Sequence, residues 1–274
     1  MPSLNDGTTL PDVGFGTYPL RGDEGTQAVL SALDLGYRLI DTAVNYRNED
    51  AVGRAIAQTP VPREEIVVTT KLPGRDHGYD ETLASFDRSA AALGLETVDL
   101  YLIHWPNPSV GKYVEAYRAM VRLQEEGRVR SVGVSNFTAE HLARVADATG
   151  VVPAVNQVEL HPFFPQAELR TFHAEHGIVT EAWSPLGKRA PVKEAGPVVA
   201  AAAARGVTAA QVVLRWHRQL GVVPIPKSAD PARQRENLDL EGFELSGAEV
   251  EAITALGRPD GRLFDGDPNT HEEM

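Results

Sequence analysis

The sequence predicts an α/β fold, a (β/α)8 TIM barrel, and three observations lead to it. Short apolar segments rich in β-branched residues alternate with segments of helical spacing throughout the 274 residues. A glycine, the residue that most easily adopts the left-handed conformation at a helix end, follows most of the helical segments. Eight such units usually take about 250 residues, so we expect one barrel domain over residues 1–274.

Seven strand candidates follow one another at intervals that leave room for a helix after each. They begin near Arg38, Ile66, Val98, Val129, Ala154, Ile178 and Val222. A weaker segment, Phe243–Leu245, is the candidate for the eighth strand. Because helices connect the strands, the strands should be parallel.

The helical segments carry start and stop signals. Asp80–Leu93 and Lys112–Glu126 show helical spacing, and the long interval Gly187–Gly221 leaves room for an extra helix. The predicted starts are two capping boxes, Thr208 with Gln211 and Ser246 with Glu249, and the N-cap candidates Thr138 and Asp80. The predicted stops are Gly36, Gly94, Gly127, Gly150, Gly177, Gly221 and Gly257.

Both ends of the chain are expected to lie outside the repeated units. Residues 4–15 contain Asn-Asp-Gly, a turn sequence, and are predicted to form an N-terminal β-hairpin that covers the bottom of the barrel. The tail after Gly257 has glycine, proline and aspartate but no apolar period. It is predicted to be a C-terminal loop over the active site.

An open, doubly wound sheet is the alternative architecture. That fold places a glycine fingerprint directly after its first strand. Gly14-Phe15-Gly16 supplies only part of that fingerprint, is followed by Pro19 and lies before the first strong strand. The sequence therefore favours the barrel, and it contains neither a P-loop nor a His-Glu-x-x-His pattern.

Composition limits the compartment and the partners that we expect. The formal charge of −12 argues against nucleic acid or an anionic membrane as the main partner. The chain has no cysteine, which excludes disulfides and is compatible with a reducing cytoplasm. The N-terminus is unlike a signal peptide, and the apolar run Val198–Ala204 is far shorter than the roughly 20 residues of a membrane span. We expect a cytoplasmic monomer that acts on a small molecule.

Four polar residues stand at or just past the ends of three consecutive strand candidates. Asp41 and Tyr46 belong to the first candidate and the loop after it, Lys71 to the second and His104 to the third. A strand buried on both faces should be apolar, so each polar residue costs stability unless it is paired. Because the active site of such a barrel lies at the carboxyl ends of its strands, we expect the four side chains to converge.

The four side chains have the chemistry of proton transfer. A free tyrosine has a pKa of about 10, and the nearby ammonium of Lys71 is expected to lower the pKa of Tyr46. Asp41 can keep Lys71 ionised among apolar neighbours. His104 can hold a carbonyl oxygen in line with the Tyr46 hydroxyl. This set predicts the delivery of a proton to a developing alkoxide.

Each of these residues alone also has a structural explanation, such as a cap or a satisfied core histidine. Their joint occurrence at three successive strand ends favours a functional site. A second chemistry stays open, in which Lys71 forms a Schiff base as in aldolase-type barrel enzymes. The pair His173 and His176 could suggest a metal, but without carboxylate partners a solvated helix face is favoured, and we predict no metal site.

Seven stretches, which include the four polar residues, make the chain resemble the aldo-keto reductases from about residue 5 to residue 257. They are Asp41-Thr42-Ala43 with Tyr46, Thr70-Lys71-Leu72, Leu102-Ile103-His104-Trp105-Pro106, Gly133-Val134-Ser135-Asn136-Phe137, Asn156-Gln157-Val158-Glu159, Trp183-Ser184-Pro185-Leu186-Gly187, and Ile225-Pro226-Lys227-Ser228 with Arg233, Glu236 and Asn237. The resemblance is strongest to bacterial members that reduce 2,5-diketogluconate and similar short carbonyls.

The resemblance implies an NADP-dependent oxidoreductase that reduces aldehydes or ketones to alcohols. Asp41, Tyr46, Lys71 and His104 match the family's catalytic residues, with Tyr46 as the general acid. Tyr46, His104 and Trp105 match positions that contact the substrate. Some relatives of this fold are non-catalytic, so an NADP(H)-binding sensor or auxiliary subunit stays open as an alternative function.

The resemblance also implies NADPH/NADP+ as the cofactor, bound without a Rossmann domain. The matching positions are Gly16, Thr17, Asp41, Ser135, Asn136, Gln157, Trp183, Ser184, Leu186, Lys227, Ser228, Arg233, Glu236 and Asn237. Among them, Ser135, Asn136 and Gln157 match the residues that bind the carboxamide. Trp183 matches the aromatic residue that stacks on the nicotinamide, which is more often Tyr or Phe.

The last part of this set corresponds to the adenosine end of the cofactor. Lys227, Ser228 and Arg233 match the cradle of the 2′-phosphate, and Glu236 and Asn237 match adenine contacts. The residue types support this assignment independently. A lysine, a serine hydroxyl and the start of a helix at Asp230-Pro231 together make an anion site.

Overall fold

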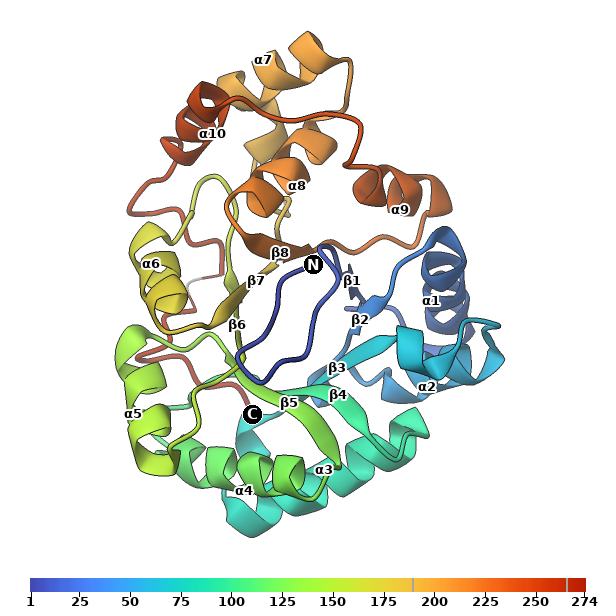
Figure 1. Ribbon diagram of the computed structural model, residues 1–274, viewed down its shortest axis with the longest axis vertical. Helices are drawn as coiled ribbons and strands as arrows, with labels where there is room; N and C mark the ends of the chain where they lie inside the picture. The colour runs from blue at the N-terminus through green and yellow to red at the C-terminus, as the bar shows by residue number, and fades with distance from the viewer. Residues whose placement is uncertain (189, 265) are drawn as a thin grey trace.

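The structure is a computed structural model that describes residues 1–188, 190–264 and 266–274. In this part of the chain, eight parallel strands pair in sequence order and form a ring with helices around it (Figure 1). The strands are β1 (Phe15–Gly16), β2 (Leu39–Asp41), β3 (Val67–Leu72), β4 (Val98–Ile103), β5 (Val129–Ser135), β6 (Val155–Glu159), β7 (Val179–Trp183) and β8 (Val222–Ile225). The predicted (β/α)8 barrel is confirmed.

The helices alternate with the strands along the chain. The α-helices are α1 (Gly22–Leu35), α2 (Glu49–Gln58), α3 (Tyr79–Leu93), α4 (Tyr113–Glu125), α5 (Ala139–Thr149), α6 (Ala167–Glu175), α7 (Gly196–Arg205), α8 (Ala209–Gln219), α9 (Pro231–Leu238) and α10 (Gly247–Thr254). Short 3-10 helices are η1 (Val44–Tyr46), η2 (Arg63–Glu65), η3 (Gly74–Asp76) and η4 (Val192–Glu194). The extra helix predicted in the interval before β8 is present, because both α7 and α8 lie there.

Two backbone hydrogen bonds close the ring between its first and last strands. The amides of Gly14 and Gly16 donate to the carbonyls of Pro224 and Pro226, each at 3.0 Å. A Cβ atom at Gly14 would lie 2.4 Å from Cδ1 of Ile225, so glycine permits this close approach. The closure contradicts the open-sheet alternative.

The prediction of an eighth strand at Phe243–Leu245 is wrong. That segment is a loop whose apolar side chains pack beneath α7, α8 and α10. The missing strand is β1, which lies before the first helix and pairs with Ile40 and Asp41 of β2. Apolar residues at 243–245 therefore serve the packing of the outer helices, not the barrel wall.

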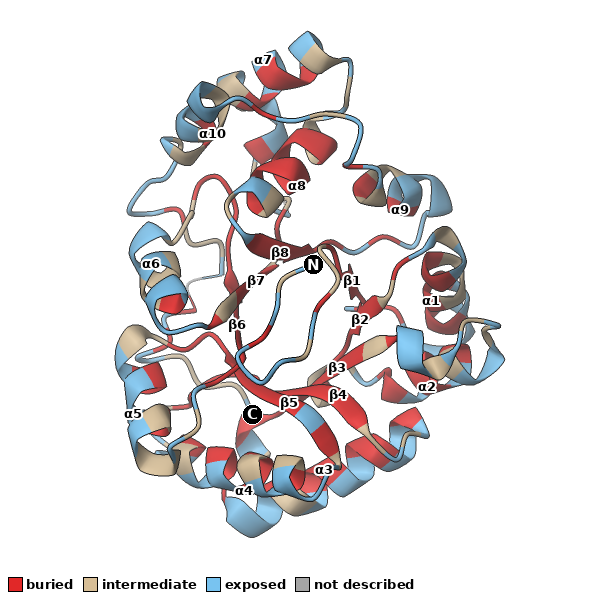
Figure 2. Ribbon diagram, in the orientation of Figure 1, coloured by how far each residue is buried: buried red, intermediate tan, exposed pale blue. Residues whose placement is uncertain are grey.

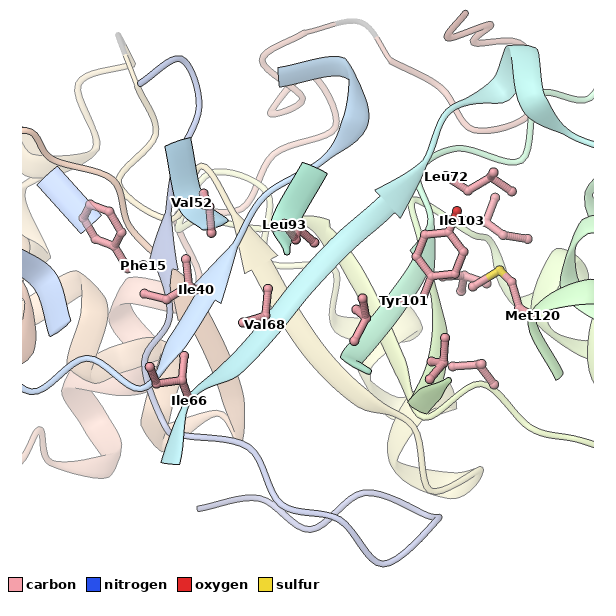
Figure 3. Packing of buried hydrophobic residues seen from close by; sticks show 14 of the residues in the cluster. Phe15, Ile40, Val52, Ile66, Val68, Leu72, Leu93, Tyr101, Ile103 and Met120 are labelled. Atoms are coloured by element: carbon pink, nitrogen blue, oxygen red, sulfur yellow. The ribbon is translucent and has the colours of Figure 1, made fainter. Parts of the chain in front are cut away.

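Side chains of the strands alternate between the inside of the barrel and the surrounding helices. Ile40 and Tyr101 belong to the outer core that also contains helix residues (Figure 3). Leu39 and Leu102 belong to a separate cluster inside the ring. The same alternation turns Asp41 and His104, two positions further along, toward the mouth of the barrel.

The N-terminal segment closes the opposite end of the barrel. It forms a small hairpin with an antiparallel bridge between Ser3 and Thr9, and it crosses the middle of the ring in Figure 1. Leu4 and Leu10 are buried in the inner apolar cluster. Asn5 donates to the carbonyl of Val152 at 3.2 Å and so ties the hairpin to the barrel.

The predicted helix starts hold with one exception. Thr138, Thr208 and Ser246 each accept a hydrogen bond from the backbone three residues later and form capping boxes. Asp80 is not an N-cap. Helix α3 begins after Gly78, whose φ of 131° few other residues adopt, and Asp80 lies in its first turn.

The predicted helix stops also hold with one exception. Gly36, Gly94, Gly127, Gly150, Gly177 and Gly221 have positive φ angles. Gly257 does not have a positive φ among the described backbone. A Cβ atom there would lie 2.8 Å from Pro165, so close packing is the constraint at this position.

The helices bury one face and expose the other, while the strands are almost entirely buried (Figure 2). Helix α8 shows this most clearly, because Trp216 is fully buried and its indole N–H donates to Thr254 Oγ1 at 3.0 Å. In the described ranges no single helix is long and apolar enough to cross a membrane. Helices α7 and α8 meet that criterion only as a pair, bent by 100°.

The tail after α10 returns to the carboxyl ends of the strands without forming a helix or strand in its described part, and position 265 lies outside the described residues. The amide of Leu263 donates to Glu159 Oε1 at 2.7 Å, and the C-terminus ends within the outline of the ring (Figure 1). The predicted C-terminal loop over the barrel is therefore present.

Candidate active site

A cavity of about 720 Å³ opens at the carboxyl ends of the strands. Asp41, Tyr46 and His104 line it, while Lys71 lies behind them and is completely buried. The remaining lining residues are Gly16, Thr17, Tyr18, Pro19, Trp105, Asn136, Gln157, Trp183, Ser184, Pro185, Leu186, Lys188, Ile225, Pro226, Lys227, Phe264 and His271. The structure thus brings the four polar strand-end residues together at one opening.

Lys71 is the centre of this group. Its ammonium nitrogen lies 2.7 and 2.8 Å from the carboxylate oxygens of Asp41 and donates to the carbonyl of Thr42 at 2.9 Å. It lies 3.5 Å from the hydroxyl of Tyr46. Each of its three N–H donors has a partner, which compensates the burial of the charge.

The turn after β2 positions Tyr46. Strand β2 ends at Asp41, and η1 then carries the phenol ring back over the barrel mouth. The ring centroid lies 5.0 Å from Lys71 Nζ and 5.7 Å from the imidazole of His104, with the two rings nearly perpendicular. His104 follows β4 directly, and its amide donates to the carbonyl of Leu72 at 3.0 Å.

The protonation states of this group differ from the prediction in one respect. Burial alone would lower the pKa of Lys71, but the charge of Asp41 raises it above its ordinary value. Burial raises the pKa of Tyr46 to about 12; Lys71 lowers it, but Asp41 and Glu273 add to the rise. The prediction that Lys71 lowers the pKa of Tyr46 overall is wrong, because burial and the neighbouring carboxylates outweigh the ammonium.

Glu181 on β7 extends the buried polar group, and the sequence interpretation missed it. The side-chain amide of Gln157 donates to Asp41 Oδ1 and to Glu181 Oε2, each at 2.8 Å. Burial and the charge of Asp41 raise the pKa of Glu181 to about 7. An acid inside a buried strand is the same signal that identified Asp41, so the sequence offered the means to find it.

This raised pKa predicts how stability depends on pH. In the unfolded chain Glu181 ionises near 4.5, whereas the folded protein keeps the proton up to about pH 7. The folded state therefore binds more protons between these values, and the free energy of unfolding should fall with rising pH across that window. In Glu181→Gln this contribution, of order 1–3 kcal/mol, should disappear. Urea unfolding of both proteins at several pH values measures it, and an unchanged slope would contradict the assignment.

The terminal tail supplies two more neighbours of the site. Glu273 Oε1 lies 2.8 Å from His104 Nδ1. His271 lies against Trp105, with ring centroids 4.1 Å apart. A Cβ atom at Gly266 would lie 2.7 Å from the Trp105 ring, so the tail passes very close to it. The sequence did not indicate Glu273 or His271, because the tail has no periodic pattern.

The residues predicted to hold a carboxamide are neighbours: Ser135 ends β5 and pairs with Gln157 of β6, and Asn136 follows Ser135. The side-chain nitrogen of Asn136 donates to the carbonyl of His104 and to Ser135 Oγ, each at 3.0 Å. Its oxygen accepts a hydrogen bond from the indole of Trp183 at 2.8 Å. Both N–H groups of Gln157 donate to the acidic side chains of Asp41 and Glu181, so its Oε1 remains as an acceptor.

Four further predicted cofactor residues lie on the cavity wall. Gly16 ends β1, where it pairs with Asp41 of β2, and Thr17 follows it, with Oγ1 donating to the carbonyl of Asp41 at 2.9 Å. Ser184 and Leu186 come from the loop after β7, where Ser184 has a φ of 50°.

The predicted adenosine end lies in the segment that follows β8. Lys227 is exposed on the cavity wall and Arg233 is exposed on α9, with its guanidinium 4.0 Å from Asp230. The start of α9 is less available to an anion than predicted, because the carboxylate of Asp230 already accepts from the amide of Ala232 at 2.8 Å. Ser228 lies nearby and its hydroxyl accepts from the amide of Asp230 at 3.0 Å.

The two predicted adenine contacts, Glu236 and Asn237, have different surroundings. Glu236 accepts a hydrogen bond from Thr208 Oγ1 at 2.7 Å and so links α9 to the start of α8. Asn237 is buried at 5% exposure.

His173 on α6 and His176, which follows the helix, have different surroundings. His173 is buried, not solvated as predicted, and its ring nitrogens lie 2.9 Å from the side chain of Asn156 and 2.8 Å from that of Thr180. His176 is exposed and stacks on Phe172. Among the described residues no group of three or more His, Cys, Asp or Glu side chains could hold a metal ion.

Comparison with known proteins identifies relatives of this chain. Residues 12–258 match the model of the Aldo/keto reductase family. The chain is 58% identical over 272 residues to 2,5-diketo-D-gluconic acid reductase B of Corynebacterium sp. (strain SHS752001), covering 99% of this chain and 98% of that protein. It is 51% identical over 269 residues to an aldo-keto reductase of Mycolicibacterium smegmatis, covering 98% and 96%.

Solved structures agree with the sequence relatives. A mutant of Gox0644 in complex with NADPH has a TM-score of 0.94 and 48% identity, covering 98% of this chain and 97% of that one. A Bombyx mori aldo-keto reductase in complex with NADP has a TM-score of 0.86 and 34% identity, covering 94% of each chain.

Proposed function

This chain belongs to the aldo/keto reductase family, and from that membership we propose that it reduces aldehydes or ketones to alcohols with NADPH, using Tyr46 as the general acid. The observation that carries the proposal is the contact of Lys71 with both Asp41 and Tyr46 at the wall of the cavity, beside His104. This arrangement provides a proton donor and no activated nucleophile. Reduction by hydride transfer needs a proton donor of this kind and needs no nucleophile from the protein.

The residues of the cavity fit a nicotinamide cofactor. The two acidic side chains that take the N–H groups of Gln157 leave its oxygen as an acceptor, which suits the amino group of a carboxamide. Ser135 and Asn136 would donate to the carboxamide oxygen after exchanging their present partners. Trp183 would cover the ring, held in place by its hydrogen bond to Asn136. Bound there, NADPH supplies the hydride.

The adenosine end of the cofactor would lie along the segment after β8. Lys227 and Arg233 would hold the 2′-phosphate by charge, and Ser228 would add a hydroxyl. Glu236 and Asn237 would contact the adenine. Gly16, Thr17, Ser184 and Leu186 would line the path between the two ends.

The protein's own chemistry is confined to the proton. The raised pKa keeps the Tyr46 hydroxyl protonated at neutral pH, so that it is a donor when the carbonyl oxygen becomes an alkoxide. The phenolate that remains lies against the Lys71 ammonium, which favours it. His104 and Trp105 orient the carbonyl at the substrate end.

Schiff-base chemistry at Lys71 is disfavoured by its surroundings. A lysine nucleophile must lose its proton and reach the substrate carbonyl. Lys71 is completely buried, and Asp41 raises its pKa. An exposed, neutral amine is therefore lacking at this position.

The direct test is a panel of small aldehydes and ketones with NADPH, followed by the loss of NADPH absorbance. We expect turnover of several neutral short-chain carbonyls. A protein that binds NADPH but oxidises it with none of them would instead be a sensor or auxiliary subunit. We further propose that the enzyme works as a cytoplasmic monomer with one barrel domain, for which its mass in solution is the first check.

A prediction about cofactor choice follows from the adenosine end. Arg233→Ala should weaken NADPH binding about 10- to 100-fold, because a charge-assisted contact with the 2′-phosphate contributes roughly 1.5–3 kcal/mol. NADH binding should be unchanged. Arg235, an exposed arginine on the same helix, provides the matched control Arg235→Ala. Fluorescence titration of the three proteins with both cofactors measures the affinities, and equal affinity of the unmodified protein for NADPH and NADH would refute the assignment.

A further inference from the structure

We propose that Glu273, the residue before the C-terminal Met274, is a positioning residue for His104, so that the end of the tail completes the active site. The proposal rests on the proposed carbonyl reduction and adds a residue to it. The carboxylate of Glu273 acts on the ring nitrogen of His104 and sets where the ring carries its proton.

The tail is held on the barrel mouth by the backbone of Glu273 and by the side chain of Glu272. The carbonyl of Glu273 accepts a hydrogen bond from the side chain of Asn107 at 2.6 Å. Glu272 accepts from the amide of Ser109 at 2.8 Å. A Cβ atom at Gly74 would lie 2.1 Å from the carbonyl oxygen of Glu273, so the loop after β3 leaves room for the tail only with glycine there.

The side chain of Glu273 is then directed at the catalytic group. Its Oε1 accepts from Asn45 Nδ2 at 2.7 Å and lies 2.8 Å from His104 Nδ1. Asn45 is itself fixed, because Arg75 donates to its oxygen at 2.5 Å. The carboxylate is thus aimed at His104 by two anchors, the Asn107 contact on its backbone and the Asn45 contact on its side chain.

The charged and titratable groups around Glu273 favour its ionised form. Burial works to raise the pKa of Glu273, but His104, Asn45 and His271 together hold it below its ordinary value. His77, on the loop after β3, is buried nearby, and burial lowers its pKa to about 4 despite the neighbouring carboxylates, so it stays neutral. The negative charge of Glu273 also acts on Tyr46, because it is one of the groups that raise the pKa of Tyr46.

An ionised carboxylate only accepts hydrogen bonds. Because Glu273 Oε1 lies 2.8 Å from Nδ1 of His104, a proton on Nδ1 is favoured, since two lone pairs would repel each other; this buried nitrogen has no other polar partner among the described residues. A neutral ring with its proton on Nδ1 has no proton on Nε2. His104 can therefore donate from Nε2 to a carbonyl oxygen only when both of its nitrogens are protonated. The ring is then positively charged, and the carboxylate of Glu273 is the negative charge that pairs with it.

The test compares Glu273→Gln with Glu272→Gln. Both variants remove one carboxylate from the tail, but only the first removes the charge at His104, and Glu272 is an anchor of the tail outside the site. The ¹⁵N shifts of the His104 ring, assigned with His104→Asn, report which nitrogen carries the proton. Steady-state kinetics with a neutral aldehyde and a titration with NADPH complete the set.

We expect a protonated Nδ1 in the unmodified protein and in Glu272→Gln, and a shift of the proton toward Nε2 in Glu273→Gln. The kcat of Glu273→Gln should fall roughly 10- to 100-fold, because a neutral ring with its proton on Nε2 is a weaker donor to the carbonyl oxygen than the imidazolium that pairs with the Glu273 carboxylate. Its affinity for NADPH should stay within about twofold, and Glu273→Asp should recover part of the loss. An unprotonated Nδ1 in the unmodified protein, or equal kcat in the two Gln variants, would overturn the proposal. If the unmodified protein reduced no carbonyl, the proposed function would fail, and the ¹⁵N shifts would still decide whether Glu273 holds the ring.

Discussion

Replacing Tyr46 with Phe should reduce kcat for carbonyl reduction on the order of 10³-fold and leave NADPH affinity unchanged within about twofold. The phenol is the proton donor in the proposed mechanism, and a positioned general acid contributes roughly 10²–10⁴-fold to a rate. The variant keeps the ring that packs against His104 and Tyr18, so the cavity wall should persist. Single-turnover mixing of the NADPH complex with an aldehyde measures the chemical step.

A matched control for this variant is Tyr18→Phe. Tyr18 lines the same cavity and its ring lies 5.2 Å from that of Tyr46, but its hydroxyl has no role in the mechanism. It should keep kcat within about threefold. Near-normal turnover in Tyr46→Phe would show that another group delivers the proton.

Replacing Asp41 with Ala should destabilise the protein by about 3–5 kcal/mol, because it leaves the ammonium of Lys71 buried without its charge partner. The loss should become smaller as the pH rises. Without Asp41 the pKa of the buried Lys71 should fall below that of a free lysine, so the unfolded state binds more protons, and stability then increases with pH. Urea unfolding at two pH values measures both effects.

The double variant Asp41→Ala with Lys71→Met separates charge from packing. Removing both charges leaves no unpaired ion, so the double variant should be more stable than Asp41→Ala alone. If the double variant were less stable than either single variant, the pair would stabilise the fold by packing and not by compensating its own burial. Gln157, which also donates to Asp41, is kept in all three proteins.

The barrel could be predicted because seven of its strands are long and apolar enough to stand out. The eighth strand could not be predicted, because β1 has only two residues, Phe15–Gly16, and a glycine in a sequence usually indicates a turn. Phe243–Leu245 looked more like a strand because a loop that packs under helices also needs apolar residues. A strand this short is defined by its neighbours in space, which a single sequence does not show.

The candidate site likewise contains residues that could be predicted from the sequence and residues that could not. Asp41, Lys71 and His104 could be found because a polar residue in a buried strand breaks a local rule. Glu181 breaks the same rule but lies on β7, at least three strands after the others in sequence order. No sequence pattern marks Glu273, because only the path of an irregular tail brings it to His104.

The protonation of Tyr46 shows a further limit of the sequence. The residues that face it were predictable, but the balance between them was not. Lys71 does lower its pKa, yet burial and the carboxylates of Asp41 and Glu273 raise it more. Such a balance depends on distances and burial that only the folded chain determines.

The most direct measurement follows the hydrogen atoms themselves. The protein is incubated with a small aldehyde and with NADPH that carries deuterium in place of both hydrogens at C4 of the nicotinamide, and the product is analysed by mass spectrometry. Our account predicts an alcohol that carries one deuterium on the former carbonyl carbon, formed by the unmodified protein and very slowly by Tyr46→Phe. An unlabelled alcohol, or the absence of alcohol with a protein that binds NADPH, would contradict it.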